Sequence, residues 1–493
     1  MKNNLKNAVY NAIGFIFPVL VGLFTTPYIV HKLTPEVYGI YVLVISLMGL
    51  LSFLDLGFGQ GIIKFVSHYE AKGDFKRIND IINTSLFINV IMGLLGAVII
   101  FTFSKFLSLY VFKVKSEHLE TSILSFQIVS VGFFLNLLSS TFSNIPKALQ
   151  RYDVAVKIQN FVWFCSIMSS VLLLYLGYGL VEMMTFYVIF QLLGVFLYYY
   201  SSKKLLPTLK LSLSFKKDVF KEIFGFSVYT SINAITGNIV FRVDKMIISY
   251  FLGTAAVTYY QIPFMIVQMA NGFISSVIQF LMPAVSFINS FGDKEKLKEL
   301  YIKYTKYLFL TSIIIFTGLV LFGKPFLILW IGNNIAEKSY SLLIIIALVF
   351  FFVSISNVGY YFYNGIGKSY INMISSFVGS VSYLVAAVLL VPKYSLIGAA
   401  VAFSFILLPY PVYIHYLNKI VGVEQKFYID LLLKALVYII VIVMIGFNFI
   451  LNITFINSVI VGSLLFLLIL TLIGFTFISK TDFIEIKRRV LKV

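Results

Sequence analysis

The chain has 493 residues, of which 60% are hydrophobic and 12% are charged, and its mean hydropathy is +0.96. Soluble globular proteins carry roughly 25% charged residues, so this chain has too little polar surface to face water on all sides, and a soluble enzyme or binding module is excluded. The formal charge of +18 does not indicate a nucleic-acid partner. The basic residues fall in short loops between hydrophobic segments, where they indicate membrane topology and contact with anionic lipids.

Hydrophobic segments of about 20 residues, long enough to cross the hydrocarbon core, follow one another along the chain. They predict an all-α integral membrane protein with about fourteen transmembrane helices. The predicted spans lie near 8–30, 36–58, 79–103, 119–141, 158–177, 181–201, 223–251, 254–285, 304–322, 340–362, 372–391, 396–416, 431–450 and 456–478.

Lysine and arginine are unevenly distributed between alternate loops. With the N-terminus placed in the cytoplasm, 29 of the 38 basic residues fall on the inner side and 7 on the outer side. This excess predicts that the N- and C-termini are both cytoplasmic, and the even number of spans agrees. The longest loop, 203–222, is basic and amphipathic. It is expected either to lie on the inner membrane face, as an interfacial helix or linker, or to be a solvated linker.

The sequence matches itself at a nearly constant offset, which indicates an internal repeat. A shift of 219 places LTPEVYGIY, which begins at Leu33, on LGTAAVTYY, which begins at Leu252, and the Gly-Asp pair at 73–74 on the pair at 292–293. A shift of 217 sets ALQRY against GIGKS, each in the loop after the fourth span of its half.

The repeat predicts two six-helix bundles of the same orientation, related by an axis along the membrane normal. The expected segments are an N-terminal bundle (1–202), a basic interfacial linker (203–222), a C-terminal bundle (223–417), and two appended helices with a basic cytoplasmic tail (418–493). Two facing bundles would leave a central cavity, which suits alternating access and favours transport over enzymology.

Ionisable side chains inside a span cost at least about 2.5–3.5 kcal/mol at the helix centre and therefore suggest function. The sequence FRVDK in the seventh span contains Arg242, Asp244 and Lys245. Arg242 and Lys245 are three residues apart, share a helix face and could hold an anionic phosphate. Alternatively, Asp244 pairs with a basic neighbour and the group caps the outer end of the helix.

A second charged position lies at the end of the second span, in LDLGFGQGIIK. Asp55 could take part in proton or cation coupling, or it could pair with Lys64. Glycines 57, 59 and 61 would let the backbone bend or a neighbouring helix approach closely.

Four asparagines could face a sugar or make interhelical hydrogen bonds: Asn233 and Asn238 in the seventh span, with Asn136 and Asn144 around the fourth. The four histidines are scattered, and the single cysteine has no partner. No metal site, disulfide or cofactor is expected.

The chain resembles the polysaccharide biosynthesis or oligosaccharide flippase family, within the multidrug/oligosaccharidyl-lipid/polysaccharide exporter superfamily. The resemblance rests on the arrangement of the spans and on four patterns: NAVYNAIGFIFPVLVGLFTTPYIVHKLTPEVYGIY, LDLGFGQGIIKFVSHY, FRVDKMIISYFLG followed by a Tyr-Tyr pair, and the NGIGKS loop. It implies a flippase that moves a polyprenyl-pyrophosphate-linked oligosaccharide across the bacterial inner membrane by alternating access. The transported glycan would serve O-antigen, capsule or exopolysaccharide assembly, beside polysaccharide polymerase machinery.

The resemblance also implies roles at matching positions. Asp244 stands at the family's acidic position before an aliphatic run, and Asp55 in its Asp-x-Gly after the second span. The family tends to have a cationic cavity, which Arg242 and Lys245 would supply.

Three alternatives were weighed: a multidrug or cation antiporter, a lipid II flippase, and a membrane-embedded sugar polymerase. An antiporter would favour acidic, aromatic-lined sites over basic ones. A polymerase would carry a large outer loop, which this chain lacks. No Walker loop, zinc motif or nucleophile elbow occurs in the sequence, so no enzymatic activity is expected.

Overall fold

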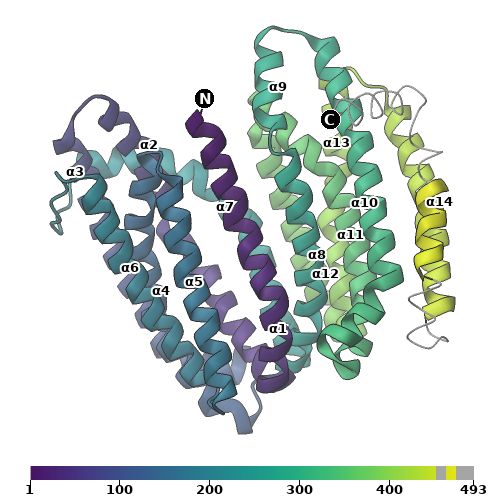
Figure 1. Cartoon of the computed structure of the whole chain (residues 1–493), viewed down its shortest axis with the longest axis horizontal. Coiled ribbons are helices and arrows are strands. Elements are labelled where there is room, and N and C mark those ends of the chain that lie inside the picture. Colours follow the sequence, from purple (N-terminus) through teal and green to yellow (C-terminus); the bar gives the residue numbers. More distant parts are fainter. Residues whose placement is uncertain (1, 451–461, 473–493) are drawn as a thin grey trace. The chain divides into compact units, whose positions relative to one another are not determined.

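The computed structural model describes residues 2–450 and 462–472, and within these residues every regular element is a helix (Figure 1). The predicted all-α fold class is therefore confirmed. The chain divides into two compact units, Met1–Thr258 and Tyr259–Val493, and each is described by itself.

The first unit is built from seven helices and the start of an eighth. These are α1 (Lys2–Leu51), α2 (Phe58–Ala71), α3 (Phe75–Phe106), α4 (Leu119–Ala148), α5 (Tyr152–Tyr175), α6 (Leu180–Leu205), α7 (Lys217–Leu252) and the first residues of α8 (Thr254–Ile278). Short 3-10 segments (Ser52–Asp55 and Ser116–His118) and one π turn (Leu107–Val111) join them.

The first two predicted spans lie on α1 and meet at a break without a loop. Thr34 has φ 68° and ψ 157°, outside the helical region, and Pro35 follows it. Proline disfavours helical backbone at the preceding residue and donates no N–H. The hydroxyl of Thr258 donates to the Pro35 carbonyl oxygen at 2.6 Å, so the break is covered by the first turns of α8.

Residues with positive φ recur in the second half of the chain at the sequence offsets of 217 and 219. Positive φ values pair Thr34 with Gly253, Gly73 with Gly292, Lys113 with Gly332, and Gln150 with Gly367. Asp74 and Asp293, also one offset apart, cap α3 and α10 by accepting a backbone N–H three residues later. The division into two six-helix bundles stays a prediction, because the compact units part at Thr258 and α7 packs within the first.

The second unit continues from α8 through six further helices. These are α9 (Leu281–Ser290), α10 (Lys294–Ile331), α11 (Asn333–Ile366), α12 (Ser369–Phe403), α13 (Tyr410–Val421) and α14 (Gln425–Ile450), with a 3-10 segment at Ser404–Leu407 and an apolar helix at Gly462–Leu472. Like α1, α12 contains a break, at Ser395 (φ 53°, ψ −138°). The predicted span 372–391 lies before it, and the span 396–416 begins after it and continues into α13.

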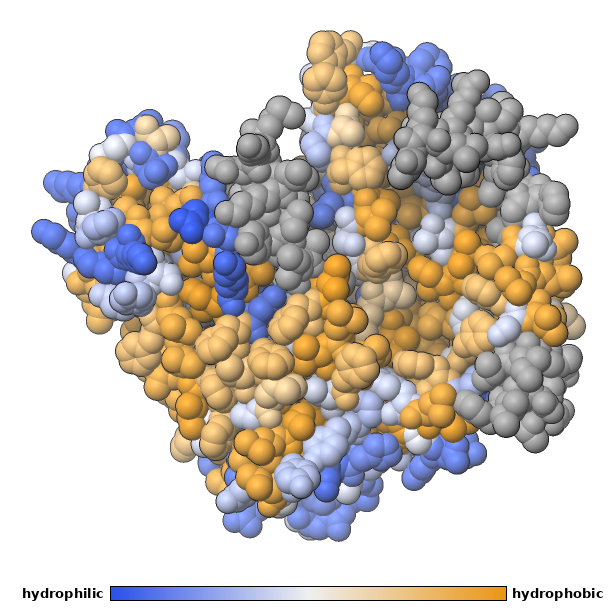
Figure 2. Space-filling view, viewed as in Figure 1, coloured by the Kyte–Doolittle hydropathy of each residue, from blue (hydrophilic) through white to orange (hydrophobic). Residues whose placement is uncertain are grey.

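Ten helical segments of the described residues are long and apolar enough to cross a membrane. In each unit the visible face is covered by hydrophobic side chains along its middle, with hydrophilic side chains gathered toward the ends (Figure 2). The protein is a multi-pass membrane protein. The count of fourteen spans stays a prediction, and most of the last span, 456–478, lies outside the described residues.

The segment between α6 and α7 contains a turn at residues 207–208 and no helix over residues 206–216, so it is not the interfacial helix that was one of the alternatives. Two asparagines one turn apart on α3 pair with its backbone. Asn79 Oδ1 accepts from Lys210 N at 2.7 Å, and Asn83 bridges Lys210 O and Ser212 N, both at 2.9 Å. The linker is thereby held to the first unit.

Ion pairs extend this attachment to the start of α7. The guanidinium of Arg77 on α3 contacts the carboxylates of Asp218 and Glu222 on α7, and Lys216 contacts Asp80 at 2.7 Å. The hydrogen bond from Arg77 lowers the pKa of Asp218 below its ordinary value.

Candidate functional site: a polar cavity in the first unit

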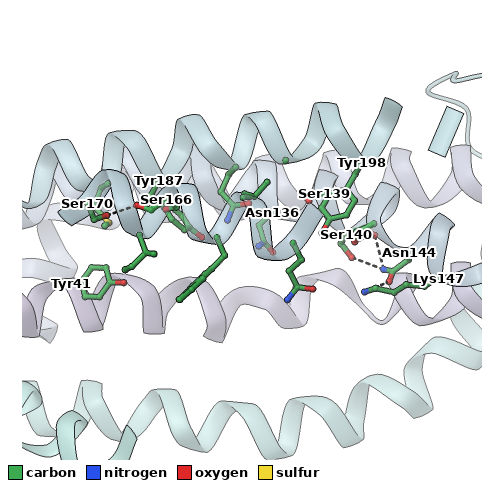
Figure 3. A pocket seen from close by; sticks show the side chains of 18 residues that line it. Tyr41, Asn136, Ser139, Ser140, Asn144, Lys147, Ser166, Ser170, Tyr187 and Tyr198 are labelled. Carbon is green, nitrogen blue, oxygen red and sulfur yellow. Dashed lines mark hydrogen bonds between the residues drawn. The ribbon is translucent and has the colours of Figure 1, made fainter. Parts of the chain in front are cut away.

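A cavity of about 440 Å³ lies within the first unit, among the second half of α1, α4, α5 and α6 (Figure 3). Its volume is within the range of small-molecule binding pockets. It is lined by Tyr41, Asn136, Ser139, Ser140, Ser143, Asn144, Lys147, Gln159, Val162, Trp163, Ser166, Ile167, Ser170, Met184, Tyr187, Gln191, Gly194 and Tyr198.

One face of α4 supplies a continuous polar wall. Its lining residues are three or four positions apart, a spacing that puts them on one side of a helix: Asn136, Ser139, Ser140, Ser143, Asn144 and Lys147. Tyr41 and Lys147 lie toward opposite ends of this wall, with Asn136 between them (Figure 3). The cavity therefore has two chemically different ends.

The facing helices add amide and hydroxyl groups and one indole ring. Gln159 and Ser166 come from α5, and Gln191 comes from α6. Trp163 on α5 also lines the cavity, and the ring of Phe17 from α1 meets its ring edge to face, with centroids 6.5 Å apart. This contact holds the indole in place.

The lining residues include neither a carboxylate nor an arginine, and Lys147 is the one lysine among them. Hydroxyl and amide groups can both donate and accept hydrogen bonds. The cavity can therefore bind an uncharged polyhydroxylated ligand along its length and an anionic group at the Lys147 end.

A chain of hydrogen bonds fixes the side chains around Lys147 (Figure 3). Lys147 Nζ donates to Asn144 Oδ1 at 3.3 Å, and Asn144 Nδ2 donates to the Ser140 carbonyl oxygen at 2.8 Å. The hydroxyl of Ser140 donates to Asp55 Oδ1 at 3.1 Å. Asp55 is thus connected to the cavity through its wall.

Asp55 lies in the 3-10 turn between α1 and α2 and is held by neutral donors. Besides Ser140, it accepts from Gly59 N at 3.3 Å and from Asn89 Nδ2 at 3.4 Å. Lys64 is exposed, with its ammonium 4.9 Å from the centre of the Phe65 ring. A coupling role for Asp55 stays a prediction.

Glycine at position 59 allows Asp55 and the α4 wall to come together. A Cβ there would stand 2.5 Å from Asn144 Nδ2, closer than van der Waals contact allows. The glycine-rich segment noted in the sequence thus permits close approach of α2 to α4.

The three charges of FRVDK are engaged at two places: Arg242 contacts α1, and Asp244 pairs with Lys245. Arg242 Nη1 donates to the Ile45 carbonyl oxygen on α1 at 3.4 Å. Lys245 and Asp244 are 4% and 1% exposed and form a buried ion pair at 3.2 Å, and Lys245 Nζ also donates to the Phe241 carbonyl oxygen at 2.8 Å. A joint phosphate site of Arg242 and Lys245 stays a prediction.

The predicted asparagines divide into two groups. Asn136 and Asn144 both lie on the cavity wall. Asn233 and Asn238 belong to the part of α7 whose side chains lie outside the described residues.

Sequence reasoning did not single out Lys147, Trp163 or Gln191 as site residues. Lys147 was counted among the cytoplasmic loop charges, although it belongs to the polar stripe of α4. The available signal was the recurrence of polar residues at a helical spacing within an otherwise apolar span.

A family model described as "Polysaccharide biosynthesis protein" matches residues 4–289. A Shigella flexneri protein named "Putative O-antigen transporter" is 24% identical over 413 residues, which cover 81% of this chain and 94% of the relative. The Bacillus subtilis "Uncharacterized membrane protein EpsK" is 25% identical over 336 residues, 66% of this chain and 64% of the relative.

Solved structures share the fold. The lipid II flippase MurJ, in an inward closed conformation, superimposes with a TM-score of 0.72 at 16% identity, covering 96% of this chain and 100% of MurJ. An inward-facing multidrug resistance MATE family transporter of the MOP superfamily gives 0.69 at 15% identity, covering 84% and 94%.

Proposed function

The chain belongs to the polysaccharide biosynthesis protein family, and from this premise we propose that it is a flippase for lipid-linked oligosaccharides. Its substrate is a glycan joined through a pyrophosphate to a polyprenyl lipid, and its product is the same molecule on the other leaflet. The glycan serves the assembly of O-antigen, capsule or exopolysaccharide. The relative named as an O-antigen transporter supports this substrate class.

The observation that carries the proposal is the composition of the cavity wall. Sugars present hydroxyl groups, which need partners that both donate and accept, and the serine, asparagine, glutamine and tyrosine side chains of the wall supply them. A cationic drug would need a carboxylate, and the lining residues include none. The cavity therefore favours a glycan over the cation of an antiporter.

The physical task is to shield a polar head group from hydrocarbon. Moving a sugar through lipid would strip its hydroxyls of hydrogen bonds, at a cost of a few kcal/mol for each group. A polar cavity replaces the lost water, while the lipid tail stays in the bilayer. No covalent bond is formed or broken, so transport requires no catalytic residue.

Alternating access is the proposed mode of transport. The shared fold occurs in MATE family transporters in both inward-facing and outward-facing conformations. The two compact units of this chain are the natural moving bodies. We place the protein in the bacterial inner membrane with both termini in the cytoplasm, in accordance with the distribution of basic residues.

The membrane and the polymerase machinery are the proposed partners. The extended linker exposes Leu211, Leu213 and Phe215 at alternate positions, between Lys210 and Lys216. Alternating apolar side chains flanked by lysines suit an anionic bilayer surface. Polysaccharide polymerase machinery would take the flipped substrate on the outer side.

Reconstitution tests the proposal. Full-length protein in proteoliposomes receives a fluorescent undecaprenyl-pyrophosphate oligosaccharide, and a membrane-impermeant quencher reports its transfer between leaflets. We expect transfer at least tenfold faster than in protein-free vesicles. Lipid II and a cationic dye are tested in parallel. Movement of only lipid II would favour a cell-wall precursor flippase, and movement of only the dye would favour an antiporter; either result would overturn the proposal.

A further inference from the structure

We propose that the cavity of the first unit is a subsite that binds a sugar 1-phosphate in one fixed orientation. Lys147 holds the phosphate attached to the first sugar, and that sugar lies along the α4 wall toward Tyr41. The subsite selects uncharged sugars over acidic ones. This inference rests on the proposed function and specifies which part of the lipid-linked substrate this cavity recognises.

The state of Lys147 points to an anionic ligand. Its ammonium carries three donors, and among the described residues it donates to one neutral oxygen, Asn144 Oδ1, at the long distance of 3.3 Å. Among the described residues, no carboxylate lies within ion-pair distance of it. The neighbouring cation Arg151, by contrast, makes a two-bond ion pair with Asp153 at 2.9 and 3.1 Å.

The other candidate for the phosphate is less suited to it. Arg242 is half-buried against α1, where its guanidinium donates to a backbone carbonyl and fills the space beside Gly49. Lys245 is buried and paired with Asp244. Neither residue lines the cavity, so an anion entering the cavity meets Lys147.

The environment of Lys147 is built to hold its side chain at the cavity. It follows Pro146 in the last turn of α4, and the carbonyl left without a helical partner by this proline, Phe142 O, accepts from Ser202 of α6 at 3.0 Å. Asn144 is 8% exposed and is oriented by its own bond to Ser140. The last turn of α4 is therefore held by the hydrogen bond from Ser202 and by the hydrogen bond of Asn144.

The depth of Lys147 agrees with the substrate. In the predicted orientation, α4 ends at the cytoplasmic face, and Lys147 is one residue from its end at Ala148. The pyrophosphate of a lipid in the inner leaflet lies at this level, next to the head groups. The sugar then extends along the wall into the membrane-embedded part of the protein.

The wall determines which sugars fit. Beyond Lys147, its polar groups are neutral, and Trp163 adds an indole ring on which the apolar face of a sugar can stack. A second negative charge, such as the carboxylate of a uronic acid, would enter without a cation and would lose its hydration. At about 440 Å³, the cavity is also near the small end of ligand pockets and takes only part of an oligosaccharide.

Binding can be measured with the protein's own fluorescence, because the chain has two tryptophans. Trp330→Phe leaves Trp163 as the single reporter on the cavity wall. Full-length purified protein is titrated with N-acetylglucosamine 1-phosphate, free N-acetylglucosamine, glucuronic acid 1-phosphate and inorganic phosphate. We expect saturable quenching by N-acetylglucosamine 1-phosphate, with at least tenfold weaker binding of the other three.

Variants at Lys147 test the anchor. Lys147→Met should weaken binding of N-acetylglucosamine 1-phosphate about tenfold and leave binding of the free sugar unchanged, and Lys147→Arg should restore most of it. Arg242→Gln tests the alternative anchor and, if Lys147 holds the phosphate, should change the affinity less than twofold. Arg151→Gln, at a cation that pairs with Asp153 and does not line the cavity, is the matched control. Equal binding by wild type and Lys147→Met, or loss of binding in Arg242→Gln alone, would overturn the inference.

Transport of the lipid-linked oligosaccharide by the same preparations separates the two proposals. Wild-type transport without any sugar phosphate binding would remove the subsite and leave the flippase function standing. Sugar phosphate binding without transport of any lipid-linked glycan would remove the function and leave the subsite. A thermal melt of each variant shows that it is folded.

Discussion

The two units differ at positions that the predicted repeat pairs with one another. In the first unit, α1, α4, α5 and α6 surround a polar cavity, whereas the matching region of the second unit is packed with aromatic rings. Two positions paired by the sequence offset of 217–219 change from small to aromatic, Gly132 to Phe350 and Ser166 to Tyr383. The cavity residue Met184 is paired with Phe403, and Tyr41 with Tyr260.

The aromatic cluster of the second unit is closely packed. Phe403 meets the rings of Phe264, Phe350 and Tyr383 with centroids 5.3–5.5 Å apart. The hydroxyls of Tyr260 and Tyr383 lie 3.1 Å apart and satisfy each other. All five side chains are at most 5% exposed. The first unit therefore contains a polar cavity, whereas the region of the second unit around Phe403 is closely packed.

A bulky side chain placed in the cavity of the first unit should have the largest effect on transport. Ser166→Tyr introduces into the first unit the side chain that the second unit carries at the matching position. Its ring would occupy the cavity between α5 and α4, and we expect transport of the lipid-linked oligosaccharide to fall at least tenfold. Proteoliposome transport measures it. Leu172→Tyr, on the same helix but 57% exposed, is the matched control. Retained transport by Ser166→Tyr would show that the glycan does not use this cavity.

Truncating the aromatic cluster of the second unit should reduce the stability of the protein and leave ligand binding unchanged. Phe403→Ala removes the central ring of the cluster, and large-to-small changes of this kind cost about 3–5 kcal/mol in a well-packed core. We expect a lower thermal midpoint in detergent and an affinity for N-acetylglucosamine 1-phosphate within twofold of wild type. Phe405→Ala, at a ring that is 42% exposed, should leave the midpoint nearly unchanged. A large loss of affinity in Phe403→Ala would mean that the two units share the binding site.

The sequence predicted the helical fold and part of the cavity wall, but not the contrast between the two units. Hydropathy and the repeat offset predicted the helices and placed Asn136 and Asn144 as sugar-facing candidates, and both line the cavity. Linear spacing also showed that Arg242 and Lys245 share a helix face. It could not show the partner of Arg242, because the Ile45 carbonyl is distant in sequence. Packing, which decides whether a polar stripe meets a cavity or a neighbouring helix, depends on all the surrounding side chains.

A substitution at Gly59, where α2 approaches the cavity wall, should have a smaller effect on ligand affinity. Gly59→Ala would place a methyl group against the Asn144 side-chain nitrogen. That atom is the end of a side chain and can move, so folding should survive while Lys147 loses the oxygen that orients it. We expect about three- to tenfold weaker binding of N-acetylglucosamine 1-phosphate by Trp163 fluorescence. Gly225→Ala, where an added Cβ meets no atom within 4 Å, should bind as wild type. Equal affinities in both variants would show that Asn144 does not position Lys147.

The smallest effect concerns the N-terminal ends of α3 and α10, which also differ between the units. Arg77 reaches across to Asp218 on α7, whereas Lys296, one offset later, pairs with Asp293 at the start of its own helix. Arg77→Gln should therefore speed amide hydrogen exchange at the start of α7 (217–222) about twofold, and Lys296→Gln should leave it unchanged.

The pKa of Asp218 determines how the difference in hydrogen exchange between Arg77→Gln and wild type depends on pH. Its pKa is lowered by the bond from Arg77, so the pairing is fully present above the ordinary aspartate value of about 3.9 and is lost only as the pH falls through the lowered one. After correction for intrinsic exchange, the ratio between Arg77→Gln and wild type should be the same at pH 7 and pH 5. A ratio that collapses by pH 5 would mean that a group of higher pKa maintains the attachment of the linker. In that case the difference between the N-terminal ends of α3 and α10 would not come from the Arg77–Asp218 pair.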